Sequence, residues 1–417
     1  MVYKYYGLVN ISSLPHFFIY FIFYIFYMHN IFNLFFNLIL LFIFFIFLYY
    51  YLFFIYLVYK GKNMADREFI NFLRDREEII NHSLKRNNKS ITKFKKTIEN
   101  IKQEKEYNNI VADYTEYNPL HRGHKYCLDR GKEKGLFICI LPGPLERSGR
   151  GIPYLINRYL RAEMAIKAGA DIVIEGPPMG IMGSGQYMQC IVKMFHTIGV
   201  DIIPRGYIKN KCMEKIICLI NKGYHISTKP YKISCIETKE FLCEKLEIDN
   251  YIIASLSNTI YKLNNKFNIN YNPKFLFVER LEGISGSKIR EYIYSGRFQE
   301  VKNMVHNTTL EVLNRHLKEK TMEDIILKRF EDRILETANE YPLEEYLQKN
   351  IAEILEKNRP YGSIEEIKKV IPKGFSRHFK ERIISKLECR IEKNIISEYI
   401  KKYPSEIKIL FTNEDVI

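Results

Sequence analysis

The sequence contains no tryptophan and no Cys-x-x-Cys pair, and no Asp, Glu, Lys or Arg occurs between Lys4 and Lys60. Its 8 cysteines are scattered over 417 residues without zinc-ligand spacing, which excludes a small disulfide-rich scaffold and predicts reduced thiols in a cytosolic protein. A charged fraction of 27% beside 47% hydrophobic residues excludes a wholly disordered chain. The net charge of +15 suits a polyanionic partner or an anionic membrane surface.

The uncharged N-terminal stretch holds 14 of the 28 phenylalanines before residue 55. Residues 14–59 are long enough for one or two membrane spans, since about 20 apolar residues cross a bilayer. They are too many for a signal peptide and lack its cleavage site. Alternatively, translation starts at Met64 and residues 1–63 are a mis-called upstream extension, which the shortage of small residues favours. The protein is then cytoplasmic; otherwise this segment anchors it to a membrane.

The remaining chain divides into three regions by pattern. Residues 64–109 show apolar positions at helical spacing among charges, which predicts a helical arm, either packed on the body or free to bind a partner. Residues 110–297 alternate short apolar strands with helices, which predicts a parallel sheet with right-handed crossovers. Residues 298–417 are helical and basic. The fold class is therefore α/β, with a parallel-sheet domain followed by a helical C-terminal domain.

The loop after the first predicted strand carries the strongest chemical signal, Thr-Glu-Tyr-Asn-Pro-Leu-His-Arg-Gly-His at 115–124. Ligands of such sheets bind at loops that lead from strands into helices. Pro119 stiffens this loop, Gly123 permits close approach of a ligand, and the helix start presents unpaired N–H groups. His121 and His124 would donate hydrogen bonds to phosphate oxygens whose charge grows in a transition state. The loop therefore predicts a phosphate site.

A second motif, Ile-Ser-Gly-Ser-Lys-Ile-Arg at 284–290, lies far along the chain. Its hydroxyls and cations, at a loop-to-helix junction, suit the β- and γ-phosphates of a nucleoside triphosphate. Taken alone, it is also compatible with a capping serine and a basic first turn.

The phrases Glu-Tyr-Asn-Pro-x-His-x-Gly-His at 116–124 and Ile-Ser-x-x-x-Ile-Arg at 284–290 resemble the HxGH nucleotidyltransferase superfamily. The sequence is most similar to its tRNA(Met) cytidine acetate ligases, over residues 111–296. The resemblance implies a Rossmann-like nucleotidyltransferase domain at 110–297. It also implies ATP contacts from Tyr117, Asn118, Pro119, Gly123, Gly206, Asn258, Arg280, Ser285 and Ser287.

The resemblance further implies a reaction with ATP and Mg²⁺, without metal-ligating residues in the protein. A small carboxylate such as acetate would attack the α-phosphorus, pyrophosphate would leave, and the acyl group would pass to a tRNA cytidine. No protein base is required, because a carboxylate is ionised at neutral pH. The catalytic residues would be His121, His124, Lys288 and Arg290. Departures from the family pattern at 206–208 and 256–258 affect substrate identity more than nucleotide chemistry.

Two further segments carry secondary predictions. Between residues 368 and 390 the basic residues outnumber the acidic ones, with Phe375 and Phe379 interleaved. Such a face can hold phosphates and stack on bases, although it is equally typical of a solvated surface. The nucleic-acid contacts would be Lys373, Arg377 and Arg382. The glycine-rich residues 142–151 predict a flexible loop, and a role as a lid would bring Arg147 and Arg150 near phosphates.

Two other functions remain compatible with the sequence. One is an adenylyltransferase of a phosphorylated small metabolite, which uses the same two motifs but has no need of a basic C-terminal domain. The other is a membrane-tethered RNA-binding protein without catalysis, against which the intact His121, Gly123, His124, Ser285 and Arg290 argue.

Overall fold

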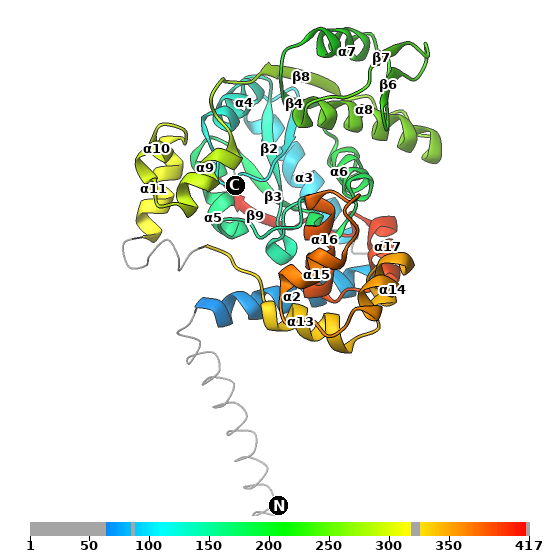
Figure 1. Ribbon diagram of the computed structural model, residues 1–417. Coiled ribbons are helices and arrows are strands. Elements are labelled where there is room, and N and C mark those ends of the chain that lie inside the picture. The colour runs from blue at the N-terminus through cyan, green and yellow to red at the C-terminus, as the bar shows by residue number, and fades with distance from the viewer. Residues whose placement is uncertain (1–63, 85–87, 318–325, 414–417) are drawn as a thin grey trace, which may run out of the picture. The chain divides into compact units, whose positions relative to one another are not determined.

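The computed structural model describes residues 64–84, 88–317 and 326–413 (Figure 1). The hydrophobic segment 1–63 lies outside these residues, so both interpretations of it stay predictions. Among the described residues, every helix is too short or too polar to cross a membrane.

A six-stranded sheet with the order β8-β4-β1-β2-β3-β9 organises the chain. Its first five strands are parallel, and β9 pairs antiparallel with β3. Every residue of β1 and β2 is buried, as expected for central strands of a parallel sheet. The α/β class is thus confirmed. The strands are β1 (Ile110–Tyr114), β2 (Leu136–Pro142), β3 (Ile172–Gly176), β4 (Ile202–Tyr207), β8 (Lys274–Glu279) and β9 (Ile409–Thr412).

Helices connect the parallel strands, and their ends follow local sequence signals. Asn157 caps the helix after β2 by accepting from the backbone N–H groups of Tyr159 and Leu160. Gly199 ends the helix after β3 with φ of 75°, a left-handed conformation that favours glycine. The connecting elements are α4 (Arg122–Lys132), η2 (Pro144–Glu146), α5 (Arg158–Lys167), η3 (Met179–Ile181), α6 (Ser184–Ile198), α7 (Lys211–Asn221) and α8 (Ile248–Phe267).

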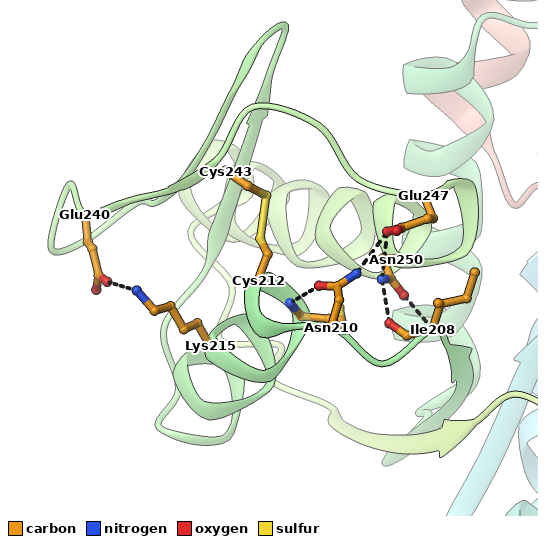
Figure 2. Close-up of a disulfide and its surroundings, with 9 residues drawn as sticks. Ile208, Asn210, Cys212, Lys215, Glu240, Cys243, Glu247 and Asn250 are labelled. Carbon is orange, nitrogen blue, oxygen red and sulfur yellow. Dashed lines mark hydrogen bonds and ion pairs between the residues drawn. A yellow bond between two sulfur atoms is a disulfide. The ribbon is translucent and has the colours of Figure 1, made fainter.

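A small antiparallel sheet is inserted between α7 and α8, which the sequence patterns did not predict. It contains β5 (Ile226–Lys229), β6 (Lys232–Cys235) and β7 (Phe241–Cys243). A disulfide between Cys212 and Cys243 joins the start of α7 to β7 (Figure 2). For this pair the prediction of reduced thiols was wrong, because only the packing of α7 against β7 brings together two cysteines that are distant in sequence.

The N-terminal helices α2 (Met64–Leu84) and α3 (Asn88–Glu104) pack on the sheet domain. Phe72 and Ile98 belong to the same buried cluster as the residues of β1 and β2. Asp75 is almost completely buried and pairs with Arg158 of α5 at 2.6 Å. These contacts make residues 68–104 part of the body rather than a projecting arm.

The C-terminal region contains a second, smaller core. It is formed by α13 to α16, with Ile334, Leu355 and Leu387 buried at its centre. Tyr399 and Tyr403 pack instead into the core of the main sheet. The helices are α9 (Gly286–Tyr294), α10 (Phe298–Lys302), α11 (Asn307–His316), α13 (Glu331–Glu340), η4 (Leu343–Glu345), α14 (Lys349–Lys357), α15 (Ile364–Val370), α16 (Arg377–Cys389) and α17 (Lys393–Lys402).

One strand departs from the predicted all-helical C-terminal region. β9 has only four residues, too few for an alternating pattern to stand out in the sequence. It lies beside β3, with Ile172 opposite Thr412 and Val173 opposite Phe411. The end of the described chain therefore returns to the main sheet.

Candidate active site

A cleft of about 750 Å³ opens where the signature loop meets the second motif. It lies at the carboxyl ends of β1 and β4, the position expected for ligands of parallel sheets. Nine of the residues predicted for chemistry or nucleotide binding line it: Asn118, His121, Gly123, His124, Gly206, Arg280, Ser285, Ser287 and Arg290. Two motifs that are distant in sequence thus share one cavity.

His121 and His124 cap the start of α4 reciprocally. The Nδ1 atom of His121 accepts from the backbone N–H of His124 at 3.2 Å. The Nδ1 atom of His124 accepts from the backbone N–H of His121 at 3.4 Å, and the two rings stack with centroids 3.6 Å apart. An Nδ1 atom that accepts carries no proton, so each neutral ring bears its proton on Nε2. Both histidines are therefore positioned as Nε2 donors.

Burial keeps both rings neutral. It lowers the pKa of His121 to about 3, with further lowering by the charges of Arg280 and Arg290. The pKa of His124 also lies well below its usual range, through burial and then the neighbouring His121. Neutral rings at physiological pH can donate hydrogen bonds to phosphate oxygens without acting as proton carriers.

The two glycines beside these histidines leave space that side chains would fill. A Cβ atom added to Gly123 would lie 3.2 Å from the ring of His121. One added to Gly286 would lie 3.3 Å from Nη1 of Arg290 and 3.8 Å from Nε2 of His121. The Nε2 atom of His121 and the guanidinium of Arg290 therefore both lie close to Gly286, where a side chain would crowd them.

Arg290 is buried, and its described hydrogen bonds are to uncharged oxygens. Nη1 donates to the carbonyl of Asn118 at 2.7 Å, and Nη2 donates to Oγ of Ser287 at 3.1 Å. Burial, and then the charge of Arg150, lowers the pKa of Arg290. The side chain thus ties the signature loop to the second motif and presents positive charge to the cleft.

Two ion pairs that the sequence reasoning missed also line the cleft. Arg205 donates to Asp113 at 2.9 Å and to the carbonyl of Tyr114 at 2.7 Å. Burial raises the pKa of Asp113, and Arg205 opposes that rise. Arg280 pairs with Asp249 of α8 and donates to the carbonyl of Ile284 at 3.1 Å. An acid such as Asp113 in an apolar strand signals a buried partner, which could have pointed to Arg205.

Five residues predicted for nucleotide or nucleic-acid binding do not line the cleft. Tyr117 is completely buried beneath His124, with ring centroids 5.1 Å apart. Asn258 faces the inserted sheet, where Nδ2 donates to Oγ1 of Thr228 at 2.9 Å. The remaining three that are absent from the lining are Pro119, Lys373 and Arg377.

Lys288 also lies outside the cleft lining. Its Nζ atom is 5.7 Å from the centre of the Tyr292 ring, on the same helix. The positive charge facing the cleft from the second motif is therefore that of Arg290.

The C-terminal region contributes to the cleft through α16. His378 and Arg382 line it, and Nη1 of Arg382 donates to the carbonyl of Gly149 at 3.3 Å. The rings of Phe375 and Phe379 stack on each other, with centroids 4.3 Å apart, and pack against the C-terminal core, so their stacking on bases stays a prediction.

Residues 143–151 form a packed loop rather than a flexible one. Gly143, Pro144, Leu145, Arg147 and Ser148 are buried. The guanidinium of Arg147 pairs with Glu388 at 2.5 Å, so its predicted position near phosphates was wrong: a buried carboxylate of α16 holds it. Arg150 lines the cleft as predicted.

Helices beyond the second motif support the signature loop from outside. The backbone N–H of Arg122 donates to the carbonyl of Met304 at 3.1 Å. Oγ1 of Thr309 donates to the carbonyl of Leu120 at 2.8 Å. The helices α10 and α11 thus pack against the HxGH loop, although the domain boundary at residue 298 stays a prediction.

Two family models match the chain. One, described as HIGH Nucleotidyl Transferase, matches residues 108–224, and the other, Cytidyltransferase-related C-terminal region, matches residues 208–411. The uncharacterized protein MJ0951 of Methanocaldococcus jannaschii is 64% identical over 347 residues, which cover 83% of this chain and 98% of that protein.

More distant similarity extends to enzymes whose names state an activity. The tRNA(Met) cytidine acetate ligase of a Thermoanaerobacter species is 26% identical over 342 residues, covering 73% of this chain and 83% of that enzyme. The crystal structure of Thermotoga maritima TmcAL bound with alpha-thio ATP superposes with a TM-score of 0.57. At 18% identity, over 74% of this chain and 81% of that one, this likeness concerns the fold.

Proposed function

The chain belongs to the HIGH nucleotidyltransferase family, and from that premise we propose that it adenylates a small carboxylate with ATP and transfers the acyl group to a tRNA cytidine. The carboxylate is acetate or a similarly small acid. One observation carries the proposal: Nε2 of His121 and the guanidinium of Arg290 both lie close to Gly286 in the lining of one cleft. A triphosphate bound in that cleft would contact the signature histidines and the second motif together.

In the first step an ionised carboxylate oxygen attacks the α-phosphorus. The new oxygen–phosphorus bond forms as the bond to the β-phosphate bridging oxygen breaks, and pyrophosphate leaves with that electron pair. Such a transfer depends on positioning and on stabilisation of charge. The Nε2–H groups of His121 and His124 donate to the oxygens of the five-coordinate phosphorus. Because both rings are neutral, they need no proton transfer to do so.

The second motif holds the leaving group. Ser285, Ser287 and Arg290 line the cleft and present two hydroxyls and a guanidinium to the β- and γ-phosphates. Among the described residues, no group of three or more His, Cys, Asp or Glu side chains is placed to hold a metal ion. Mg²⁺ would be held by the triphosphate oxygens and would supply charge neutralisation there.

In the second step the exocyclic amine of a cytidine attacks the carbonyl carbon of the acyl-adenylate. The bond from that carbon to the phosphate oxygen breaks, AMP leaves with the electron pair, and the attacking nitrogen loses one proton to solvent. Arg382 lines the cleft, while Lys373 and Arg377 are exposed near the start of the same helix. An RNA backbone held by these cations could therefore place a nucleotide in the cleft.

The test is ATP–pyrophosphate exchange on the full chain, with acetate and a panel of small carboxylates, each with and without tRNA. Carboxylate-dependent exchange, followed by transfer of labelled acetate to tRNA, is the expected result. Pyrophosphate release that requires a phosphorylated metabolite would instead identify an adenylyltransferase of small molecules. Absence of both reactions would refute catalysis and leave a non-catalytic RNA-binding protein.

A further inference from the structure

The hydroxyl of Ser287 accepts hydrogen bonds from two guanidinium groups. Nη1 of Arg150 and Nη2 of Arg290 each lie 3.1 Å from its Oγ atom. A serine hydroxyl has two acceptor lone pairs and one donor proton. With both lone pairs directed at cations, the O–H group is left to donate to a third partner. Two positive charges and one hydroxyl donor thus converge at one point, which is the arrangement of an anion site.

Arg150 reaches this point from the loop 143–151, which two other segments hold. The backbone N–H of Gly149 donates to Oε1 of Glu116 in the signature loop at 3.1 Å. On the other side, Ser385 of α16 donates from Oγ to the carbonyl of Gly151 at 2.6 Å. The position of Arg150 therefore depends on both the signature loop and the C-terminal helix.

The contact between this loop and α16 is too close for any residue but glycine. Gly151 has φ of +81°, and an added Cβ would lie 2.4 Å from the backbone nitrogen of Arg382. In the middle of the loop, the buried Arg147–Glu388 pair joins it to the same helix. The loop is thus held on α16 at two points, and Arg150 lies between them.

We propose that Arg150, with Arg382 of α16, completes the binding site for the β- and γ-phosphates, so that the C-terminal helical region is part of the nucleotide site. This inference rests on the proposed function in taking ATP as the nucleotide. Arg150, Arg290 and Arg382 carry three positive charges, more than the single negative charge of a carboxylate ligand. A polyphosphate carries several negative charges and therefore suits this group of arginines better. The ligand chemistry is a phosphate oxygen, which ATP or an RNA backbone could supply.

The surrounding charges agree with an anionic ligand. His378 lines the same wall, and burial followed by the charges of Arg150 and Arg382 lowers its pKa. Positive charges are therefore concentrated on this wall, and a bound polyphosphate would reduce the repulsion between them.

Calorimetric titration of the full chain with ATP, AMP and pyrophosphate tests the assignment. Arg150→Ala removes a charged hydrogen bond to the outer phosphates, so it should weaken ATP and pyrophosphate roughly 10- to 100-fold. The affinity for AMP, which lacks these phosphates, should change less than twofold. The matched control is Arg130→Ala, which removes the same charge from the exposed end of α4, where Arg130 pairs with Glu133. The control should leave all three affinities unchanged.

A second variant tests whether the position of the loop matters separately from the charge of Arg150. Gly151→Ala keeps every arginine but displaces α16, and it should lower the ATP-to-AMP affinity ratio in the same direction as Arg150→Ala. If that variant does not fold, Arg150→Lys serves instead. Lysine keeps the positive charge but lacks the planar pair of N–H donors of a guanidinium, so the ATP-to-AMP affinity ratio should lie between those of the unaltered chain and Arg150→Ala.

The outcomes separate this inference from the proposed function. If the unaltered chain binds no ATP, the proposed function fails. If it binds ATP and Arg150→Ala leaves the ATP-to-AMP ratio unchanged, only this inference fails. If Arg150→Ala weakens tRNA binding and not pyrophosphate binding, the anion is an RNA phosphate and the assignment is overturned.

Discussion

The two walls of the cleft are built in different ways. The wall at the start of α4 is local and neutral, because His121 and His124 fix each other through backbone hydrogen bonds three residues apart. The other part of the lining is charged and assembled from distant segments, with Arg150 on a loop and Arg382 on α16. Hydrogen bonds between residues three apart can thus position the two histidine donors, whereas the positions of Arg150 and Arg382 depend on tertiary packing.

The difference predicts where substitutions act. A change in the local wall should affect chemistry with little effect on folding, because few core contacts depend on it. A change in the assembled wall should affect the free energy of unfolding and the affinity for phosphate together. Each of the four experiments below tests this difference between the local wall and the assembled wall.

The largest effect is expected at Glu388, which anchors the assembled wall. Its carboxylate is fully buried and pairs with Arg147 at 2.5 Å and with Arg329 at 3.0 Å. Glu388→Gln leaves the buried guanidinium of Arg147 without its paired carboxylate, whereas Arg329 keeps its pair with Glu381 at 2.8 Å. The variant should lower the free energy of unfolding by about 3–5 kcal/mol in urea denaturation. The control Glu365→Gln breaks an exposed pair with Lys368 and should cost about 1 kcal/mol or less. Equal losses in the two variants would contradict the anchoring role.

The next effect concerns the local wall. His124→Ala removes one donor to the reacting phosphate and should lower the rate of pyrophosphate exchange about 10²- to 10³-fold. His306 caps α11 in a similar way but lies outside the cleft lining, so His306→Ala should cost stability and leave exchange intact. Exchange at the unaltered rate in the His124 variant would refute the site assignment.

A smaller effect follows from the lowered pKa of His121, about 3 in the folded chain against 6.5 ordinarily. Between these values the unfolded state binds the extra proton, so stability is complete above pH 6.5 and falls as the pH is lowered. The loss should reach at most about 1.4 kcal/mol per pH unit for this histidine.

Urea denaturation at pH 5 and pH 7 measures that slope. His121→Asn keeps a good capping residue but does not titrate, so its stability should fall less between the two pH values. A steeper dependence in the variant than in the unaltered chain would show that His121 is not the group responsible.

The smallest effect is expected at the exposed cations near the start of α16. Reversing the charges of Lys373 and Arg377 to glutamate should weaken tRNA binding. It should also reduce the salt dependence of binding by about one unit of slope for each phosphate that is no longer neutralised. The affinity for ATP serves as the internal control and should stay constant. Unchanged tRNA affinity at low salt would remove these residues from the interface.

The contrast between the walls also explains what the sequence could predict. The strands, the signature loop and the second motif are contiguous patterns, and the α/β class and the cleft-lining residues from both motifs agree with the structure. The sequence placed both His121 and His124 at the helix start. It could not predict their tautomers, because these follow from the hydrogen bonds that each Nδ1 atom accepts in the folded chain.

The assembled wall could not be predicted in the same way. Arg147 and Arg150 are equally basic and three residues apart, yet one is buried against Glu388 and the other lines the cleft. Nothing in the local pattern distinguishes them, because the distinction is made by α16, which lies 241 residues further along the chain at Glu388. The same holds for Cys212 and Cys243, and for Asn258, which faces the inserted sheet.

The pairing of β9 with β3 has a consequence for synthesis on the ribosome. Residue 409 is made 233 residues after residue 176, so at roughly 5–20 residues per second the flank of β3 waits on the order of 10–50 s for its neighbour. During that interval the strand presents unpaired backbone groups, which can recruit other nascent chains. The sheet is completed only after β9 has been translated, so a product truncated before residue 409 would lack the strand that covers the edge of β3.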